Sequence, residues 1–204
     1  PHRAHIAPAP NGAGVFFRLS PSIALPMFIA VMDQTIVATA LPAIAVALDD
    51  VERIAWVVVA YLVATTIAAP VYGRLGDVYG RRRMMFVALS VMILGSTACA
   101  LSLSLPALIG GRVLQGPGRG GPVTFSQALL SESVPPRDRA RHQGYLATVV
   151  VFSNAFGPVA GGWLTSGLGW RSIFWINLPM GILAALLALR LPARAPRPDA
   201  DWRF

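Results

Sequence analysis

The sequence contains no lysine, a single cysteine and few charged residues of either sign. All 17 basic side chains are arginines, and charged residues occupy only 13% of the 204 positions, whereas a soluble domain carries about a quarter. The single cysteine, Cys99, excludes an internal disulfide and has no metal-ligand companions. We therefore expect it to serve only in packing. The scarcity of charge leaves a chain that is 55% hydrophobic.

Apolar runs of membrane-spanning length recur along the chain. A helix needs about 20 mostly apolar residues to cross a bilayer, and the sequence offers six such runs, at 22–47, 54–72, 84–104, 106–130, 144–166 and 172–190. The predicted fold class is therefore all-α: a polytopic membrane protein with six transmembrane helices. This prediction divides the chain into an N-terminal segment (1–21), a six-helix bundle (22–190) and a C-terminal tail or linker (191–204).

The arginines predict the orientation of this bundle. Thirteen arginines flank the spans on one side and only Arg53 and Arg171 on the other, while Arg112 and Arg119 lie within the fourth span. The positive-inside rule then places both termini in the cytoplasm, and the bias towards Arg, Ala, Gly and Pro suggests a bacterial inner membrane. The net charge of +8 is thus a topology signal, and we expect no nucleic-acid partner.

Two local patterns have other interpretations, and neither is favoured. Arg18, an apolar run and Ala38-Thr39-Ala40 resemble a signal peptide, but Asp33 interrupts the apolar core and five more spans follow. GPGRGG at 116–121 fits the dinucleotide pattern G-x-G-x-x-G, but it lies within a span and lacks the preceding strand and the following acid. No paired-carboxylate, His-Ser or H-E-x-x-H arrangement occurs in a span, so we expect no enzyme, no cofactor and no metal site.

Asp33, in MDQTIVATALP at 32–42, is the most unusual residue of the first span. It lies about ten residues into the span and hence ~15 Å deep at 1.5 Å per residue, where a carboxylate is costly. Three states are open: protonation caused by desolvation, a pair with Arg112 or Arg119, or exposure to a water-filled cavity. A static pair would be structural only. An acid whose arginine partner comes and goes could carry protons.

Small residues predict two close contacts between helices. In the fifth span they recur at i, i+4 and i+8 and offer a smooth face to a neighbouring helix, at Ser153, Gly157 and Gly161. Pro158 should bend that helix. In GRLGDVYGRRR at 73–83 we expect a tight link in which Asp77 accepts hydrogen bonds from backbone amides or arginines. A solvated run of charges is the alternative.

Aromatic residues close to the predicted span ends suit the interfacial belts of membrane proteins. These residues are Trp56, Tyr61, Trp163, Trp170 and Trp175. We expect most of them to anchor the helices in the lipid interface.

Five motifs in order resemble the major facilitator superfamily, and more narrowly its drug:proton antiporters of the fourteen-helix type. They are MDQTIVATALP, WVVVAYLVATTIAAPVYGRLGDVYGRRR, GRVLQG, GPVAGGWLT and WRSIFWINLPMG, and the likeness runs from about residue 22 to 190. The resemblance implies export of small, often cationic and lipophilic compounds, driven by proton entry.

The resemblance also implies roles for individual residues. Proton and substrate coupling would fall to Asp33, Gln34, Arg112 and Gln115. Gating of the cytoplasmic side would fall to Gly73, Asp77, Gly80, Arg81 and Arg82. A bend specific to antiporters would fall to Gly157, Pro158, Gly161 and Gly162.

The sequence departs from the family pattern in places. Pro117 and Arg119 intrude where glycine and small apolar residues are usual, so we expect a kinked helix or an Arg119 that lines the cavity. Ser153 replaces a glycine, and Val78 stands where a basic residue is common.

The largest departure is length, because the chain has no initiator methionine and no second bundle. We expect an N-terminal portion whose partners are the missing C-terminal bundle, the lipid bilayer, a small-molecule substrate and protons. A half-transporter that pairs with itself, or a non-transporting truncated protein or helix-pairing scaffold, is the alternative.

Overall fold

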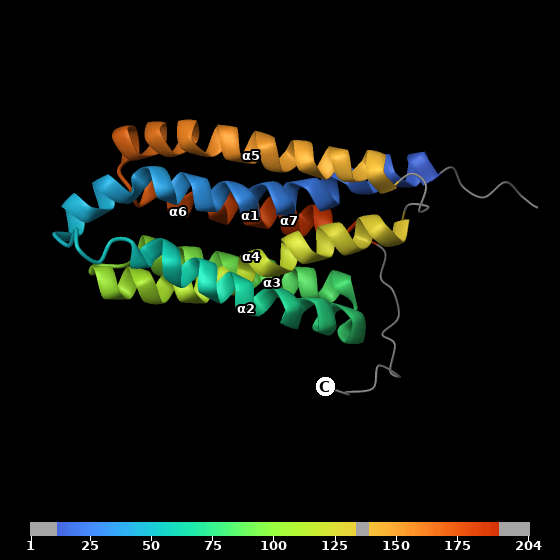
Figure 1. The fold of residues 1–204 in the computed structure, drawn as a ribbon, viewed down its shortest axis with the longest axis horizontal. Coiled ribbons are helices and arrows are strands. Elements are labelled where there is room, and N and C mark those ends of the chain that lie inside the picture. The colour runs from blue at the N-terminus through green and yellow to red at the C-terminus, as the bar shows by residue number, and fades with distance from the viewer. Residues whose placement is uncertain (1–11, 134–138, 192–204) are drawn as a thin grey trace, which may run out of the picture.

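The computed structural model describes the backbone of residues 12–133 and 139–191, and side chains within 21–129 and 139–191 (Figure 1). Most of the predicted terminal segments 1–21 and 191–204, and the first part of the link before the fifth span, lie outside these residues. The described residues form helices joined by short turns.

The helices follow one another in the order expected from the apolar runs. They are α1 (Gly12–Leu48), α2 (Trp56–Tyr79), α3 (Arg81–Ala100), α4 (Leu105–Ser133), α5 (Arg139–Leu168), α6 (Ser172–Trp175) and α7 (Asn177–Ala188). Only Ile176 separates α6 from α7, and its backbone is itself in the right-handed helical region. These two helices together therefore correspond to the predicted sixth span.

The prediction of a non-helical link at 73–83 was wrong. Helix α2 continues to Tyr79 and α3 begins at Arg81, so that Gly80 alone interrupts the helices. Its φ of 91° lies in a region that glycine occupies without the steric cost of a side chain. Helix α1 also begins well before the predicted position 22. Hydropathy marks the part of a helix that crosses hydrocarbon, whereas the helix itself can continue beyond it.

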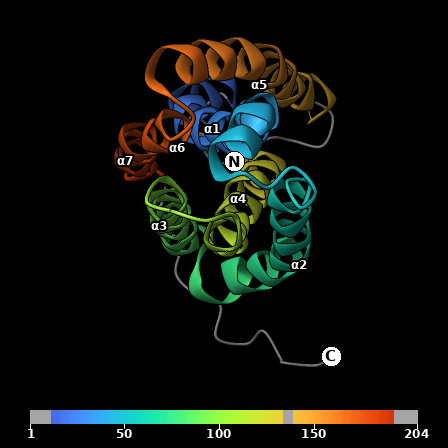
Figure 2. The ribbon, with the colours of Figure 1, turned by 90° about the vertical axis from the view of Figure 1, so that its left-hand side faces the viewer.

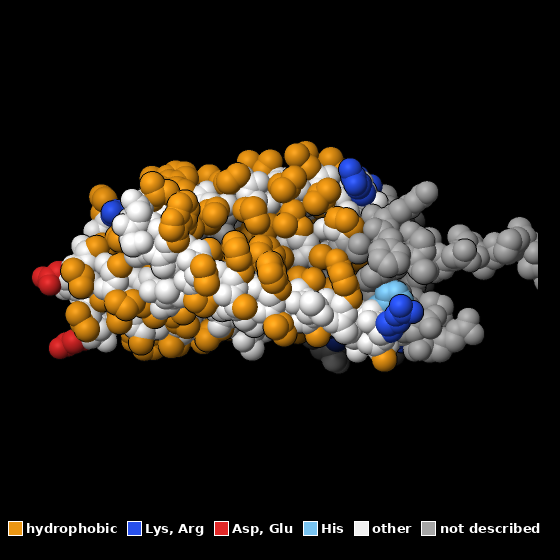
Figure 3. All heavy atoms as spheres, turned by 90° about the horizontal axis from the view of Figure 1, so that it is seen from above, with side chains coloured by type: hydrophobic (Ala, Val, Ile, Leu, Met, Phe, Trp, Pro, Cys, Tyr) orange, Lys and Arg blue, Asp and Glu red, His pale blue; other side chains and the backbone are white. Residues whose placement is uncertain are grey.

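Four described helices are long and apolar enough to cross a membrane. They are Pro21–Leu48, Trp56–Tyr79, Arg81–Ala100 and Arg139–Leu168, while Ser172–Ala188 is apolar but shorter. Helix α4 has the length, but its arginines and glycines lower its hydropathy. In Figure 3 a broad hydrophobic surface lies between the two ends of the molecule, with acidic side chains at one end and basic side chains visible at both, as expected of a membrane protein.

Helix α4 lies at the centre of the bundle. It packs on α1, α2 and α3, α5 packs along α1, and α7 contacts α1 and α3 (Figures 1 and 2). Glycines permit the close approach to two of these neighbours. A Cβ on Gly118 would lie 2.5 Å from the Met92 backbone of α3, and one on Gly116 would lie 2.8 Å from the Tyr61 carbonyl oxygen of α2. The helix remains continuous through Pro117.

Two apolar clusters occupy the two halves of the bundle. Ile29 and Met92 belong to one cluster, and Met32 and Cys99 belong to the other. One cluster ends and the other begins between Ile29 and Met32 on α1 and between Met92 and Cys99 on α3. A short middle zone therefore lies between the two clusters. The polar residues described below lie in this zone or directly beside it.

The prediction for the aromatic residues holds in part. Trp56, Trp163 and Trp175 are exposed, as anchors in a lipid interface would be. Tyr61 and Trp170 are buried, which contradicts the prediction for these two. Tyr61 lies one helical turn deeper than Trp56, and its ring packs under an arginine of α4.

Candidate functional site

A cluster of polar side chains is buried between the two apolar clusters. Its members come from four helices: Asp33 of α1, Ser96 of α3, Arg112 and Gln115 of α4, and Asn177 of α7. Each of them is at most 1% exposed. Apolar residues lie above and below the cluster on each helix, so bulk water has no open route to these groups in this conformation.

The Asp33 carboxylate accepts hydrogen bonds at both oxygens. Arg112 Nη1 donates to Oδ2 at 2.8 Å, and the two groups form a fully buried ion pair. Oδ1 accepts from Gln115 Nε2 at 3.0 Å and from Asn177 Nδ2 at 2.5 Å. Of the three states open to Asp33, the structure has the pair with a buried cation.

Arg112 of α4 contacts α2 as well as α1. Its Nε donates to the Val57 carbonyl oxygen at 3.4 Å, and its guanidinium carbon lies 3.6 Å from the centroid of the Tyr61 ring. Nη1 also donates to Gln115 Oε1 at 2.5 Å. The Nη2 atom is buried and has no hydrogen-bond partner among the described residues. One donor of the cation is therefore still available to an acceptor.

Close helix packing brings these residues together. Arg112 and Gln115 are three positions apart on α4 and so share one face. A Cβ on Gly95 would lie 2.5 Å from the Gln115 Cα, so α3 can approach closely enough for Ser96 Oγ to accept from Gln115 Nε2 at 2.6 Å. Ser96 Oγ also accepts from Asn177 Nδ2 at 3.2 Å. The serine thus ties α4 to α7 beneath the carboxylate.

Gln34 does not join the Asp33 cluster, although it is the next residue in the chain. Its Oε1 accepts from Nη1 of Arg119 on α4, and both side chains are only partly buried. Arg119 lies two helical turns after Arg112, and its guanidinium carbon is 5.7 Å from the same Tyr61 ring. Gln34 and Arg119 therefore form a second, more exposed polar contact between α1 and α4.

The residues predicted to gate the cytoplasmic side lie around the junction of α2 and α3. Asp77 Oδ1 accepts from Arg81 Nη2 at 3.1 Å within this junction, and Asp77 is well exposed. Gly76 packs against Phe125, whereas Gly73 has only an ordinary contact with Thr124. Arg82 is the second residue of α3. The sequence predicted that Asp77 would contact an arginine within a non-helical link. The contact is present, but the residues on both sides of Gly80 are helical.

The small-residue face of α5 packs on α1, as its spacing predicts. Ser153, Gly157 and Gly161 are buried, and a Cβ on Gly161 would lie 2.9 Å from the Ile36 carbonyl oxygen. Gly162 has open space beside it, and Pro158 is exposed within the continuous α5 helix. The packing thus involves two of the four residues assigned to the antiporter bend.

The sequence analysis did not identify two members of the polar cluster as site residues, nor Tyr61 beside it. Asn177 was visible as a lone amide in an apolar run, and that is the signal that could have found it. Ser96 gave no signal, because serine is common in membrane helices. Tyr61 was assigned to the lipid interface. Its distance from Arg112 depends on how α2 and α4 pack, which the spacing within either helix does not reveal.

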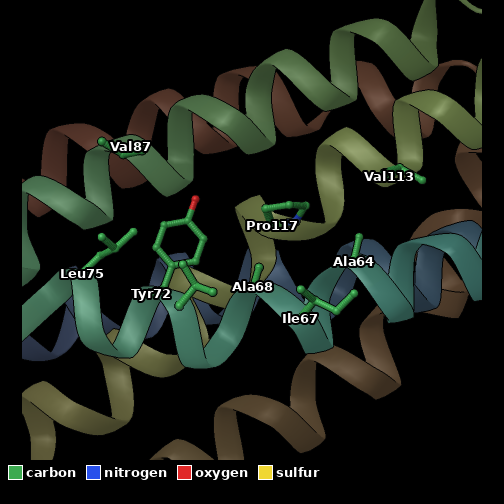
Figure 4. A pocket seen from close by; sticks show the side chains of 9 residues that line it. Ala64, Ile67, Ala68, Tyr72, Leu75, Val87, Val113 and Pro117 are labelled. Atoms are coloured by element: carbon green, nitrogen blue, oxygen red, sulfur yellow. The ribbon is translucent and has the colours of Figure 1, made fainter. Parts of the chain in front are cut away.

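Other features of the described residues carry no comparable chemistry. No group of three or more His, Cys, Asp or Glu side chains is placed to hold a metal ion in the described part of the chain. Cys99 is buried and forms no disulfide, and its Sγ lies 3.9 Å from Gln115 Oε1. A groove of about 420 Å³ between α2, α3 and α4 is lined by apolar residues around Pro117, with Tyr72 at one wall (Figure 4).

Comparison with known proteins identifies the family. The model of the Major Facilitator Superfamily matches residues 23–203. An uncharacterized MFS-type transporter of Mycobacterium tuberculosis strain H37Rv is 40% identical over 179 residues, which cover 86% of this chain and 26% of that protein. The MFS-type efflux pump LUC4 of Fusarium sp is 34% identical over 190 residues, covering 92% of this chain and 34% of that protein.

Solved structures agree on the fold. The proton:xylose symporter XylE superposes with a TM-score of 0.77 at 15% identity, covering 89% of this chain and 46% of that chain. The human organic anion transporter MFSD10 gives a TM-score of 0.70 at 20% identity, covering 95% and 52%. The chain therefore spans about a quarter to a third of the length of these curated relatives and about half of these solved chains. On this evidence the chain belongs to the major facilitator superfamily and is a multi-pass membrane protein.

Proposed function

We propose that residues 22–190 form the N-terminal six-helix bundle of a proton-coupled exporter of small lipophilic compounds, with Asp33 as the proton carrier. The observation that carries the proposal is the fully buried pair of Asp33 with Arg112, which lies between two apolar clusters. An ionisable residue inside a membrane helix is costly and usually functional.

The contacts of Arg112 suggest how proton binding would move helices. Protonation of Asp33 removes the negative charge that compensates Arg112, and a buried cation without a partner is strongly unfavourable. Arg112 must then engage another acceptor, for which its Nη2 atom is available. Because Arg112 also contacts Val57 and Tyr61 of α2, its movement would change the packing of α1, α4 and α2 together.

Family features support the remaining parts of the proposal. The relatives include proteins named efflux pumps, and transporters of this superfamily place the substrate between two six-helix halves. A second bundle would therefore complete the site. We further propose that Gly73, Asp77, Gly80, Arg81 and Arg82 gate the cytoplasmic side. Both termini would lie in the cytoplasm of a bacterial cell, as the arginine distribution indicates.

The competing proposal is a membrane protein in which the polar cluster only fixes helix packing. Buried ion pairs do serve structural roles, and they are weak evidence for stability by themselves. The geometry favours transport, because the carboxylate is held by neutral amides and one arginine whose donors are incompletely used. Transport measurements on matched variants distinguish the two proposals.

The test is accumulation of the neutral dye Nile red in cells that express the complete gene product containing these residues. We expect lower accumulation than in control cells, and a protonophore should reverse the difference. Asp33→Asn should abolish export at equal amounts of protein in the membrane, whereas Asn154→Ala, at an exposed site on α5, should not. Export that persists in Asp33→Asn would contradict the proposed role of Asp33.

A further inference from the structure

Arg119 is a second arginine in the middle of the bundle that the proton-carrying pair does not use. It is residue 15 of the 29 in α4, and it is partly exposed. Its contacts with described residues are the amide oxygen of Gln34 and, at longer range, the ring of Tyr61. Both partners are neutral, so neither compensates the charge.

The charges of the central site are unbalanced. Asp33 is the only acidic residue among the described residues 21–48 of α1, and α3, α5 and α7 contain none. Its Oδ2 pairs with Arg112 and its Oδ1 accepts from two amides. Asp33, Arg112 and Arg119 together therefore carry a net charge of +1 when Asp33 is ionised.

The packing of α4 turns Arg119 towards α1. Gly118 lies against Met92 of α3, and Gly120 lies against Ala69 of α2, so these faces of α4 have no room for a ligand. Arg119 instead shares the face of Arg112, seven positions earlier, towards α1. This face is partly open at Gln34 and Arg119, whereas the pair behind it is closed.

We propose that Arg119, with Gln34 beside it, binds an acidic group of the transported compound, such as a carboxylate. This inference rests on the proposed function and names the substrate class: lipophilic acids rather than the cations that the family resemblance implies. A guanidinium forms strong charge-assisted hydrogen bonds with a carboxylate, Gln34 can turn its amide N–H groups towards the ligand, and the Tyr61 ring offers apolar contact. An organic cation would meet the net positive charge and be repelled.

A carboxylate on a facing helix bundle is the alternative partner for Arg119. The middle position of Arg119 favours the substrate, because substrate sites in transporters of this kind lie near the bilayer midplane between the repeats. The variant Gln34→Glu tests the substrate site. The new carboxylate would pair with Arg119 and so prevent a bound acid from reaching it, while the arginine itself stays in place.

The experiment compares pyrenebutyric acid with its methyl ester, which has the same apolar body but no charge. Each is titrated into the purified complete gene product in detergent, with energy transfer from tryptophan to pyrene as the signal. We expect Arg119→Gln and Gln34→Glu to weaken binding of the acid about tenfold or more and to leave binding of the ester unchanged. Arg119→Lys should retain most of the acid binding. Comparison between variants cancels partition of the probes into micelles.

Retained ester binding shows that a variant is folded. The charge control is Arg53→Gln, in the link between α1 and α2. Acid binding that is unchanged in Gln34→Glu and in Arg119→Gln would overturn the proposal and favour an acidic side chain of a facing bundle. Because the assay measures binding without a proton gradient, its failure would leave the role of Asp33 standing. Loss of proton-driven export would likewise leave the acid-binding result standing.

Discussion

Asp33 of α1 and Arg112 of α4 lie 79 positions apart in the sequence and form a 2.8 Å ion pair that is closed to solvent. The pair is held by donors from α4 and α7, and the arginine stacks on a tyrosine of α2. A change in the charge of either partner therefore acts on four helices.

Removal of one partner should cost more than removal of both. Arg112→Gln leaves Asp33 buried without its counterion, and we expect a loss of ~3–5 kcal/mol in the free energy of unfolding. The double variant Asp33→Asn/Arg112→Gln removes both charges and should recover much of that loss. Reversible unfolding in mixed micelles measures both values. A double variant that is less stable than Arg112→Gln alone would contradict a charge-compensating pair.

Asn177 should contribute to stability through its bond to the Asp33 carboxylate. Asn177→Leu removes a donor at 2.5 Å from Oδ1 and leaves Ser96 with one partner fewer, so we expect a loss of about 1–3 kcal/mol in the free energy of unfolding. The matched control is Asn154→Leu, because Asn154 is exposed on α5. Equal effects of the two substitutions would show that the bond from Asn177 adds nothing.

Gly118 should not tolerate a methyl group. A Cβ there would lie 2.5 Å from Met92 backbone atoms, so Gly118→Ala must separate α3 from α4, and overpacking of this kind costs about 1–3 kcal/mol. Gly110→Ala, on the same helix with open space beside it, should be neutral or stabilising, since alanine is favoured over glycine in helices. Thermal unfolding of both variants in one detergent checks the difference. Similar melting temperatures would contradict the close packing of α3 on α4.

Gly80 should be required at the junction of α2 and α3. Its φ of 91° strains any residue with a side chain, and we expect Gly80→Ala to lose about 1–3 kcal/mol of stability. Gly73→Ala is the control, because a Cβ there would make only an ordinary contact, 3.9 Å from Thr124 Cγ2. Melting temperatures give the comparison. A Gly80→Ala variant as stable as Gly73→Ala would mean that the junction adopts another backbone conformation.

The sequence alone predicted most of the helices, because each apolar run has the length of a membrane span. It also located Asp33 and Arg112, since charges within such runs are conspicuous. The helical state of 73–79 was missed because glycines and charges usually mark a link, whereas here the helix extends past its apolar part. Helix boundaries depend on backbone hydrogen bonds and not on hydropathy.

The contacts within the site could not be derived from spacing. The sequence offered Arg112 and Arg119 as alternative partners of Asp33. Only the packing of α1 on α4 shows that Arg112 pairs with Asp33 while Arg119 contacts Gln34. Ser96 joins the cluster because α3 packs closely on α4 at Gly95, and Asn177 joins it because α7 packs closely on α3 at Gly181. Such contacts follow from tertiary packing, which a single sequence does not specify.

The most direct test of the account is the infrared difference spectrum of the purified complete gene product in lipid between high and low pH. Protonation of a buried carboxylate adds a carbonyl stretching band that is distinct from the band of the ionised form. Every carboxylate that takes up a proton adds to this band, so the prediction concerns the difference between variants. The unmodified protein and Asp77→Asn, which lacks an exposed carboxylate, should show a carbonyl component that Asp33→Asn lacks. Identical carbonyl components in the unmodified protein and in Asp33→Asn, across the pH range in which both stay folded, would contradict the claim that Asp33 carries a proton.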